Sequence, residues 1–206
     1  MKNIIIFALI FFPLLNSYSQ DKKESLSEKK EKLEAINSYL ETIIKDQNKA
    51  VFIAQEKLNS SLTIDIFKSN YIQAIDLNGD IHPDIQLFDK KYWILLKKQN
   101  NDKPIQDNKI WDTHKYWNKK DFKYSKIIFE SMNTKTGIES IINKYDKSDI
   151  CIYSFSEPMF YQNKKYLVFT NLKICISGGN GFVVVMKKTK SKWIRTHEAF
   201  NPNEIN

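Results

Sequence analysis

The last third of the chain restricts the fold more than any other segment, because it alternates apolar runs with short turns. Four runs rich in β-branched and aromatic residues occupy positions 150–160, 166–176, 182–187 and 193–200. The turns between them are polar or rich in glycine: Gln162-Asn163-Lys164, Gly178-Gly179-Asn180-Gly181 and Thr189-Lys190-Ser191. Turns this short join antiparallel neighbours, since a parallel crossover needs about a dozen residues or more. The sequence therefore predicts an antiparallel meander of four strands in chain order.

A helical periodicity precedes these strands. Five apolar residues spaced three or four positions apart fall on one face of a helix: Leu33, Ile36, Leu40, Ile43 and Ile44. We therefore predict a single α+β domain over residues 33–206, in which an N-terminal amphipathic helix packs on an antiparallel β-sheet. The end of this helix stays open, because residues 50–54 could prolong it or begin a strand.

The segment from 62 to 96 predicts strands followed by a helix. Ile64 and Ile66 alternate with polar residues, and residues 71–77 continue in the same manner. Asn78-Gly79 predicts a hairpin turn, because both residues tolerate positive φ. The returning strand, 81–88, contains Pro83, which places it at a sheet edge. Beyond it, Asp89 predicts the N-cap of a short helix through Tyr92, Trp93 and Leu96.

Further along, an aromatic and polar cluster stands out. Trp111, His114 and Trp117 share a face of a short predicted helix. In an exported protein such tryptophan rings can stack on sugars, so the three residues form a candidate ligand-binding cluster. The alternative is that the tryptophans pack the helix against the sheet. A strand at 126–129 and a helix from Thr136 through 145 complete this region.

The N-terminus predicts export. Met1-Lys2-Asn3 is positively charged, residues 4–15 are apolar, and Ser17-Tyr18-Ser19 places small residues at the −3 and −1 positions of a cleavage site. The apolar run is shorter than the roughly 20 residues of a membrane-spanning helix. We therefore expect a signal peptide at 1–19, a charged and frayed leader at 20–32, and a mature chain with no membrane span. Its predicted location is periplasmic or extracellular.

Export permits a disulfide between the two cysteines. Cys151 and Cys175 are equidistant from Asn163, so a hairpin folded at that residue places them opposite each other. The same register pairs Ile152 with Ile174 and Ser156 with Thr170. A bulge at Pro158 would shift this register by one residue. The sequence predicts a Cys151–Cys175 disulfide, and two free thiols are the alternative.

The C-terminal third also resembles a group of known proteins. The resemblance rests on Ser156-Glu157-Pro158-Met159-Phe160, a polar turn, a strand ending in Cys175, a glycine-rich turn, residues 183–188 and Lys192-Trp193. This pattern resembles that of small exported proteins of unassigned function from AT-rich Gram-negative bacteria. In those proteins the strand before the glycine-rich turn often ends in two cysteines. Only Cys175 is present here, so their local disulfide is not implied, and the resemblance brings no activity.

Motifs for catalysis or metal binding fail on inspection. Asp76-Leu77-Asn78-Gly79-Asp80 resembles the start of a calcium loop, but Ile81 stands where glycine is needed and Leu87 where a bidentate glutamate is needed. The three histidines have no metal-ligand spacing, and no nucleophile motif is present. Gly178–Gly181 lacks the lysine and helix of a phosphate-binding loop. We therefore predict no catalytic residue, no metal site and no cofactor.

The charge of the chain bears on which class of partner it could bind. The formal net charge is +8, yet Arg195 is the only arginine. Nucleic-acid readers favour the bidentate guanidinium, so we predict no nucleic-acid partner. The leading hypothesis is an exported binding or structural domain that engages an unknown protein or envelope component. The alternatives are an enzyme whose site assembles from distant residues such as Asp112, His114 and His197, and an exported immunity-type inhibitor.

Overall fold

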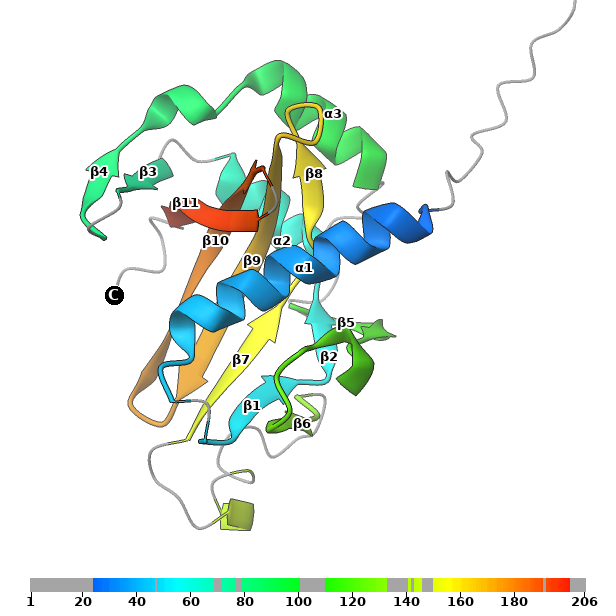
Figure 1. Cartoon of the computed structure of the whole chain (residues 1–206), viewed down its shortest axis with the longest axis vertical. Coiled ribbons are helices and arrows are strands. Elements are labelled where there is room, and N and C mark those ends of the chain that lie inside the picture. Colours follow the sequence, from blue (N-terminus) through cyan, green and yellow to red (C-terminus); the bar gives the residue numbers. More distant parts are fainter. Residues whose placement is uncertain are drawn as a thin grey trace, which may run out of the picture.

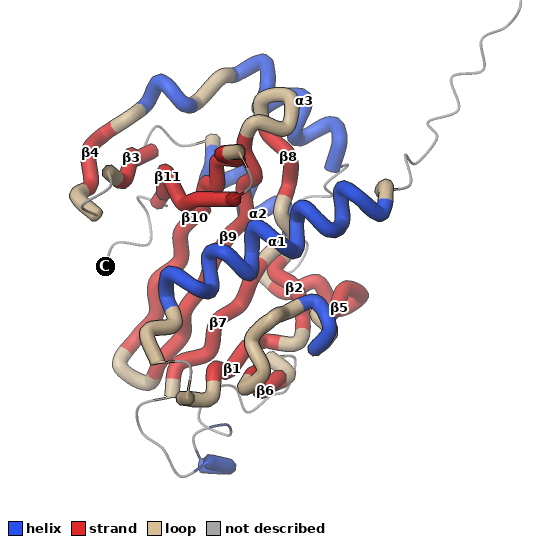
Figure 2. Tube along the Cα trace, viewed as in Figure 1, coloured by secondary structure: helices blue, strands red, loops and turns tan. Residues whose placement is uncertain are grey.

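A computed structural model describes residues 24–46, 48–68, 72–76, 79–100, 110–132, 141, 143–145, 150–190 and 192–200. It is built around one large mixed sheet with helices on both faces. Helix α1 (Leu26–Ile43) crosses one face, and α2 (Ser60–Phe67) lies behind the other (Figures 1 and 2). Helix α3 (Lys90–Asn100) lies at one end of the molecule, beside α2 and strand β8 (Met159–Tyr161). This arrangement confirms the predicted α+β class.

The large sheet has the strand order β4-β3-β11-β10-β9-β7-β1-β6, and β8 also pairs with β9. Its other strands are β1 (Val51–Ala54), β3 (Ile72–Ile75), β4 (Ile81–Pro83), β6 (Ile127–Glu130), β7 (Cys151–Phe155), β9 (Tyr166–Cys175), β10 (Gly178–Thr189) and β11 (Lys192–Phe200). A separate two-stranded sheet joins β2 (Glu56–Leu58) to β5 (Trp111–Tyr116).

The C-terminal meander is confirmed, because β7, β9, β10 and β11 are antiparallel neighbours in chain order. The whole sheet is nevertheless mixed, since β1 runs parallel to both β6 and β7. The expectation of an antiparallel sheet therefore holds for every pairing in it except the two that β1 makes. The long connections from β1 to β6 and from β6 to β7 give the chain enough length for parallel pairing.

The pairing of β7 with β9 confirms the predicted disulfide. Cys151 and Cys175 are bonded, with their Cα atoms 4.2 Å apart, and Ile152 is paired with Ile174. After Ser156 the register shifts by one residue, so that Met159 of β8 pairs with Val168. Proline cannot donate a ladder hydrogen bond, which explains why the shift occurs at Pro158.

The glycine-rich segment is not the turn that the sequence predicted. Gly178 already pairs with Cys175, so Ile176 and Ser177 form the turn and the glycines begin β10. Two of these glycines have steric reasons to be there. Gly178 has a φ of +125°, and a Cβ at Gly179 would lie 2.9 Å from the carbonyl oxygen of Lys173. A positive φ at Gly178 and close backbone approach at Gly179 therefore explain these two glycines.

Helix α1 starts earlier than the charged leader predicted at 20–32 allows. Ser25 and Glu28 form a capping box, in which each side chain accepts a hydrogen bond from the other residue's backbone N–H. The box satisfies donors at the helix start, so charged residues from Leu26 onward are helical. The predicted apolar face is confirmed, since Ile36 and Leu40 are buried and Leu33, Ile43 and Ile44 pack at its margin.

Alternate residues of the central strands point into two separate apolar layers. Leu167, Phe169 and Val184 pack with α1 on one face. Val168, Val183 and Val185 pack with α2 and α3 on the other. A third cluster, around Phe52 and Ile152, lies at the β1 end of the sheet. The central strands are therefore covered on both faces.

Two elements differ from their predicted type. The segment with Ile64 and Ile66 is the helix α2, not a strand; its side chains are buried on nearly every side, so no single apolar face marks it as a helix. The segment with Trp111 and His114 is the strand β5, not a helix. Its aromatic and threonine residues suit a strand, and β2 supplies the partner.

Other predictions in the middle of the chain, a hairpin and a helix cap, are confirmed. Strands β3 and β4 form the predicted hairpin, in which Gly79 has a φ of +89°, and β4 is an edge strand. The strand predicted at 81–88 is shorter than expected: it ends at Pro83, and a 3₁₀ helix follows at Ile85–Leu87. Asp89 caps α3 by accepting hydrogen bonds from the N–H groups of Lys91 and Tyr92. Asn78, most of the helix predicted from Thr136, and the signal peptide predicted at 1–19 lie outside the described residues. No described helix is long and apolar enough to cross a membrane.

Candidate binding surface

The predicted aromatic cluster does not form one exposed site. Trp117 is buried, and its Nε1 donates a hydrogen bond to the carbonyl oxygen of Phe155 at 3.2 Å. Trp111 is partly buried, with its Nε1 3.5 Å from Ser154 Oγ. His114 is exposed and two strand positions from Tyr116 on β5. Trp117 therefore belongs to the core beneath α1, as the alternative interpretation held.

The distant residues that could have assembled an enzyme site are also separated. Asp112 and His114 lie on β5 of the small sheet, whereas His197 lies on β11 of the large sheet. The Nε2 atom of His197 is 3.2 Å from Asp84 Oδ2, and its Nδ1 atom is 2.9 Å from Thr196 Oγ1. These contacts attach the segment after β4 to β11. No group of three or more potential metal ligands occurs among the described residues.

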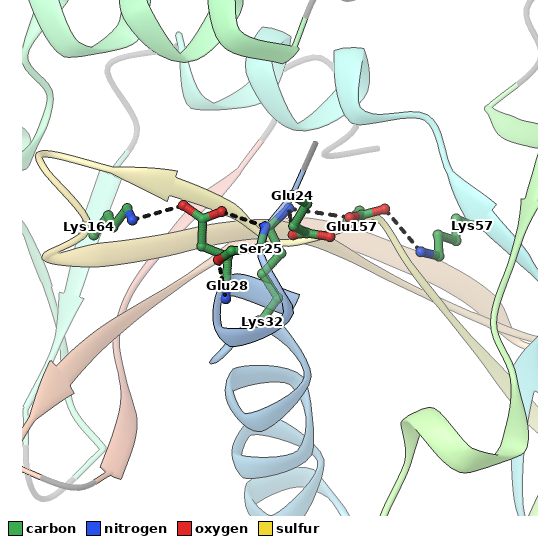
Figure 3. A network of polar contacts seen from close by, with 7 residues as sticks. All are labelled: Glu24, Ser25, Glu28, Lys32, Lys57, Glu157 and Lys164. Atoms are coloured by element: carbon green, nitrogen blue, oxygen red, sulfur yellow. Dashed lines mark hydrogen bonds and ion pairs between the residues drawn. The ribbon is translucent and has the colours of Figure 1, made fainter. Parts of the chain in front are cut away.

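The densest polar network is a clamp that fixes α1 (Figure 3). The carboxylate of Glu157 lies between two ammonium groups, 3.3 Å from Lys32 on α1 and 3.0 Å from Lys57 on β2. Lys32 also pairs with Glu24 at 2.7 Å. A second arm joins Glu28 to Lys164 in the β8–β9 turn at 2.8 Å. The clamp ties α1 to the segment between β7 and β8 and to the β8–β9 turn, and Glu157 links it onward to β2 of the small sheet.

The ionisation of the clamp carboxylates follows from these contacts. Burial raises the pKa of Glu157, but the two ammonium groups beside it outweigh burial and hold that pKa below its ordinary value. Hydrogen bonds from Lys164 and Ser25 lower the pKa of Glu28 to about 2. Both groups are charged at neutral pH and engaged by their partners. They are thus occupied in holding α1 rather than available for proton transfer.

Two further polar clusters bind elements together inside the molecule. The hydroxyl of Thr63 on α2 lies 2.8 Å from those of both Ser156 and Thr170, and all three residues are buried. Beneath α1, the buried Glu198 pairs with Arg195 at 3.1 Å. Burial raises the pKa of Glu198, and Arg195 offsets this only in part. These groups contact other groups of the protein, so their role is to hold elements together inside the fold.

Helix α3 differs from these clusters, because its polar groups face outward. The helix is fixed to the body of the protein by the fully buried Leu96 and by Trp93, whose Nε1 donates to the carbonyl oxygen of Ile64 at 3.0 Å. The neighbouring residue Tyr92 is held as well, since its hydroxyl accepts a hydrogen bond from the side-chain amide of Asn163. The helix therefore has a defined inner side and a defined outer side.

The outer side of α3 combines lysines with aliphatic side chains. Successive residues of a helix are rotated by about 100°, which places five residues on one outward arc: Lys90, Lys91, Ile94, Leu95 and Lys98. We call this arc the α3 face. Ile94 is 51% exposed and Leu95 is 40% exposed. Within the described part of the chain, none of its three lysines forms an ion pair, and α3 itself contains no carboxylate.

The sequence analysis predicted this helix but not its face. The helix through Tyr92, Trp93 and Leu96 is confirmed, and the structure adds that these three side chains pack inward. Ile94 and Leu95 read as part of the same apolar run, because nothing in the local sequence says which apolar residues find partners. The lysine pairs on either side of the run, at 90–91 and 97–98, were the available signal. No known protein family, curated protein or solved structure matches this chain.

Proposed function

We propose that this protein is an exported binding domain without catalytic activity, and that it engages a protein or an envelope component through the α3 face. The observation that carries the proposal is the character of that face. It joins exposed aliphatic groups to lysines that form no ion pair within the described residues, on a helix that Leu96 and Trp93 attach to the core. Exposed apolar groups rimmed by charge are typical of interaction sites.

The other polar groups of the described residues support a binding role over an enzymatic one. The clamp, the buried hydroxyls and the Arg195–Glu198 pair each make their contacts with other groups of the protein. The histidines considered for an enzyme site lie in different sheets. Catalysis needs an acid, a base or a nucleophile that converges on one point, and this arrangement offers no such convergence. The disulfide is compatible with an oxidising compartment.

Fractionation of the native host tests both parts of the proposal. We expect the protein outside the cytoplasm, with an N-terminus near Gln20, and we expect the purified protein to sediment with washed envelope fragments. A double variant, Lys90→Gln with Lys98→Gln, should sediment less. The matched control is Lys119→Gln with Lys120→Gln, which removes two exposed lysines from the segment after β5. Cytoplasmic protein that retains Met1 would contradict export, and equal sedimentation of both variants would contradict the role of the α3 face.

A further inference from the structure

We propose that the α3 face docks onto the surface of a membrane rich in anionic phospholipid. This inference rests on the proposed function, since it names the partner that the α3 face engages. It goes further by assigning a separate role to each kind of side chain on that face. The lysines would contact lipid phosphates, and the two aliphatic residues would enter the layer between headgroups and acyl chains.

The order of residues along α3 supports this assignment. Lys90 and Lys98 lie one turn before and one turn after Ile94, and Lys91 lies one turn before Leu95. Each aliphatic side chain is therefore bordered by ammonium groups on flexible stems. Lysine stems lie along apolar surface and extend their charge toward polar surroundings. On a membrane, that geometry lets the charges reach phosphates while the aliphatic groups sit deeper.

The shape of the site also favours a lipid surface over a folded acidic partner. The α3 face is the outside of a helix about 16 Å long, at one end of the molecule (Figure 1). It offers lysine point charges rather than the planar, bidentate arginine that favours specific carboxylate pairing. A surface of repeated phosphates requires no fixed geometry from each lysine. The charge complementarity of the α3 face is thus of the kind that a lipid bilayer satisfies.

Neighbouring side chains extend the positive charge without disturbing this geometry. Lys97 is exposed, and its ammonium group lies 5.6 Å from the ring centre of Trp93. Lys68, at the end of α2, approaches the same ring at 5.9 Å. These two lysines flank the α3 face on its inner margin. Among the described residues, the result is a local excess of cations around exposed aliphatic groups, which agrees in sign with the net charge of +8.

Vesicle sedimentation with defined lipids tests the inference. The full chain is mixed with vesicles of phosphatidylcholine alone, and with vesicles in which phosphatidylglycerol replaces about a third of it. We expect binding to the second kind only, weakened by salt because the attraction is screened within about 10 Å. A lysine near an anionic surface contributes about fivefold to binding, so Lys90→Gln with Lys98→Gln should weaken binding about thirtyfold.

The apolar part of the face has its own variant and a closely matched control. Ile94→Gln with Leu95→Gln should weaken binding by about fivefold to tenfold, because less apolar surface leaves water. The control is Ile176→Gln with Ile194→Gln, which alters side chains that are 51% and 40% exposed, as the first pair are. All variants share the same N-terminus, so the apolar segment at 4–15 contributes equally to each. Circular dichroism establishes that each variant is folded.

Each outcome decides the inference. Loss of binding in both α3 variants, with both control pairs unchanged, supports it. Binding that falls equally in Lys119→Gln with Lys120→Gln shows attraction by overall charge and overturns it. Capture of polyaspartate through the α3 lysines without vesicle binding also overturns it, in favour of an acidic protein. If envelope fragments bind through the α3 face while phosphatidylglycerol vesicles do not, the proposed function stands and the phospholipid partner is wrong.

Discussion

Two glutamates on the α1 side of the molecule, the partly buried Glu157 and the buried Glu198, have pKa values that are shifted in opposite directions. Glu157 lies between two lysines, which lower its pKa. Glu198 has one partner, Arg195, which does not compensate for its burial, so its pKa is raised. A lowered pKa means that the folded state favours the ionised form, and a raised pKa means that it favours the protonated form. Stability should therefore depend on pH in opposite directions at the two positions.

We expect Glu157→Gln to lower the free energy of unfolding by about 1–2 kcal/mol at neutral pH. The wild-type advantage is present above the pKa of an unfolded glutamate and is lost as pH falls through the lower folded pKa. Urea unfolding at several pH values measures this difference. Glu41→Gln is the control, since Glu41 is an exposed glutamate of α1 that forms no ion pair within the described residues. A loss that stays constant into acid would contradict the electrostatic role.

For Glu198→Gln the expected pH dependence has the opposite sign. Below the pKa of an unfolded glutamate, wild-type Glu198 is protonated in both states and carries no ionisation penalty. As pH rises through the raised folded pKa, the wild type loses stability relative to the variant. In the same urea series, the free energy of unfolding of the variant should therefore increase relative to that of the wild type as pH rises. A difference that moves in the same direction as for Glu157→Gln would show that the Arg195 pair dominates.

At the level of elements, the disulfide joins two strands that already pair. Its cysteines are 24 residues apart in sequence. The segment between them is already restricted, because β9 pairs with both β7 and β8. We expect Cys151→Ala with Cys175→Ala to lower the unfolding free energy by an amount near the low end of about 2–4 kcal/mol. Denaturant unfolding measures it, with the reduced wild type as the control. Failure of the variant to fold would mean that the bond does more than close this loop.

The sequence predicted elements whose pattern has a local cause. The Ile152–Ile174 pair and the hydrogen-bonded Ser156–Thr170 neighbours follow from short turns. Asp89 caps α3 because its side chain reaches nearby N–H groups. Elements that depend on residues far away in the sequence could not be predicted in this way. Helix α2 lacks a recognisable face because it is enclosed, and the parallel position of β1 depends on strands more than 70 residues away. The α3 face was hidden because burial of Leu96 and exposure of Leu95 depend on where the helix docks.

For the whole molecule, stability should decrease from the middle of the large sheet toward its edge. Strands β9 and β10 are covered on both faces, whereas all three residues of the edge strand β4 are exposed. We expect native-state hydrogen exchange to be slowest for amides of Val168 and Val184 and fastest for those of β3 and β4. Mass spectrometry of exchanged peptides measures this gradient. Equal protection of β4 and β9 would show that the sheet opens only as one unit.

The enclosure of β9 has a consequence for how the chain finds its native pairing. Its first six residues, 166–171, are all buried. A strand with one wet face resists slipping by one residue, because the slip would turn its apolar side chains toward water. Here a slipped strand would hide nearly the same apolar area. It would, however, separate Thr170 from the hydroxyls of Thr63 and Ser156, and it would move Cys175 away from Cys151. The cysteines can bond only in the aligned chain, so oxidation itself selects the native alignment during folding.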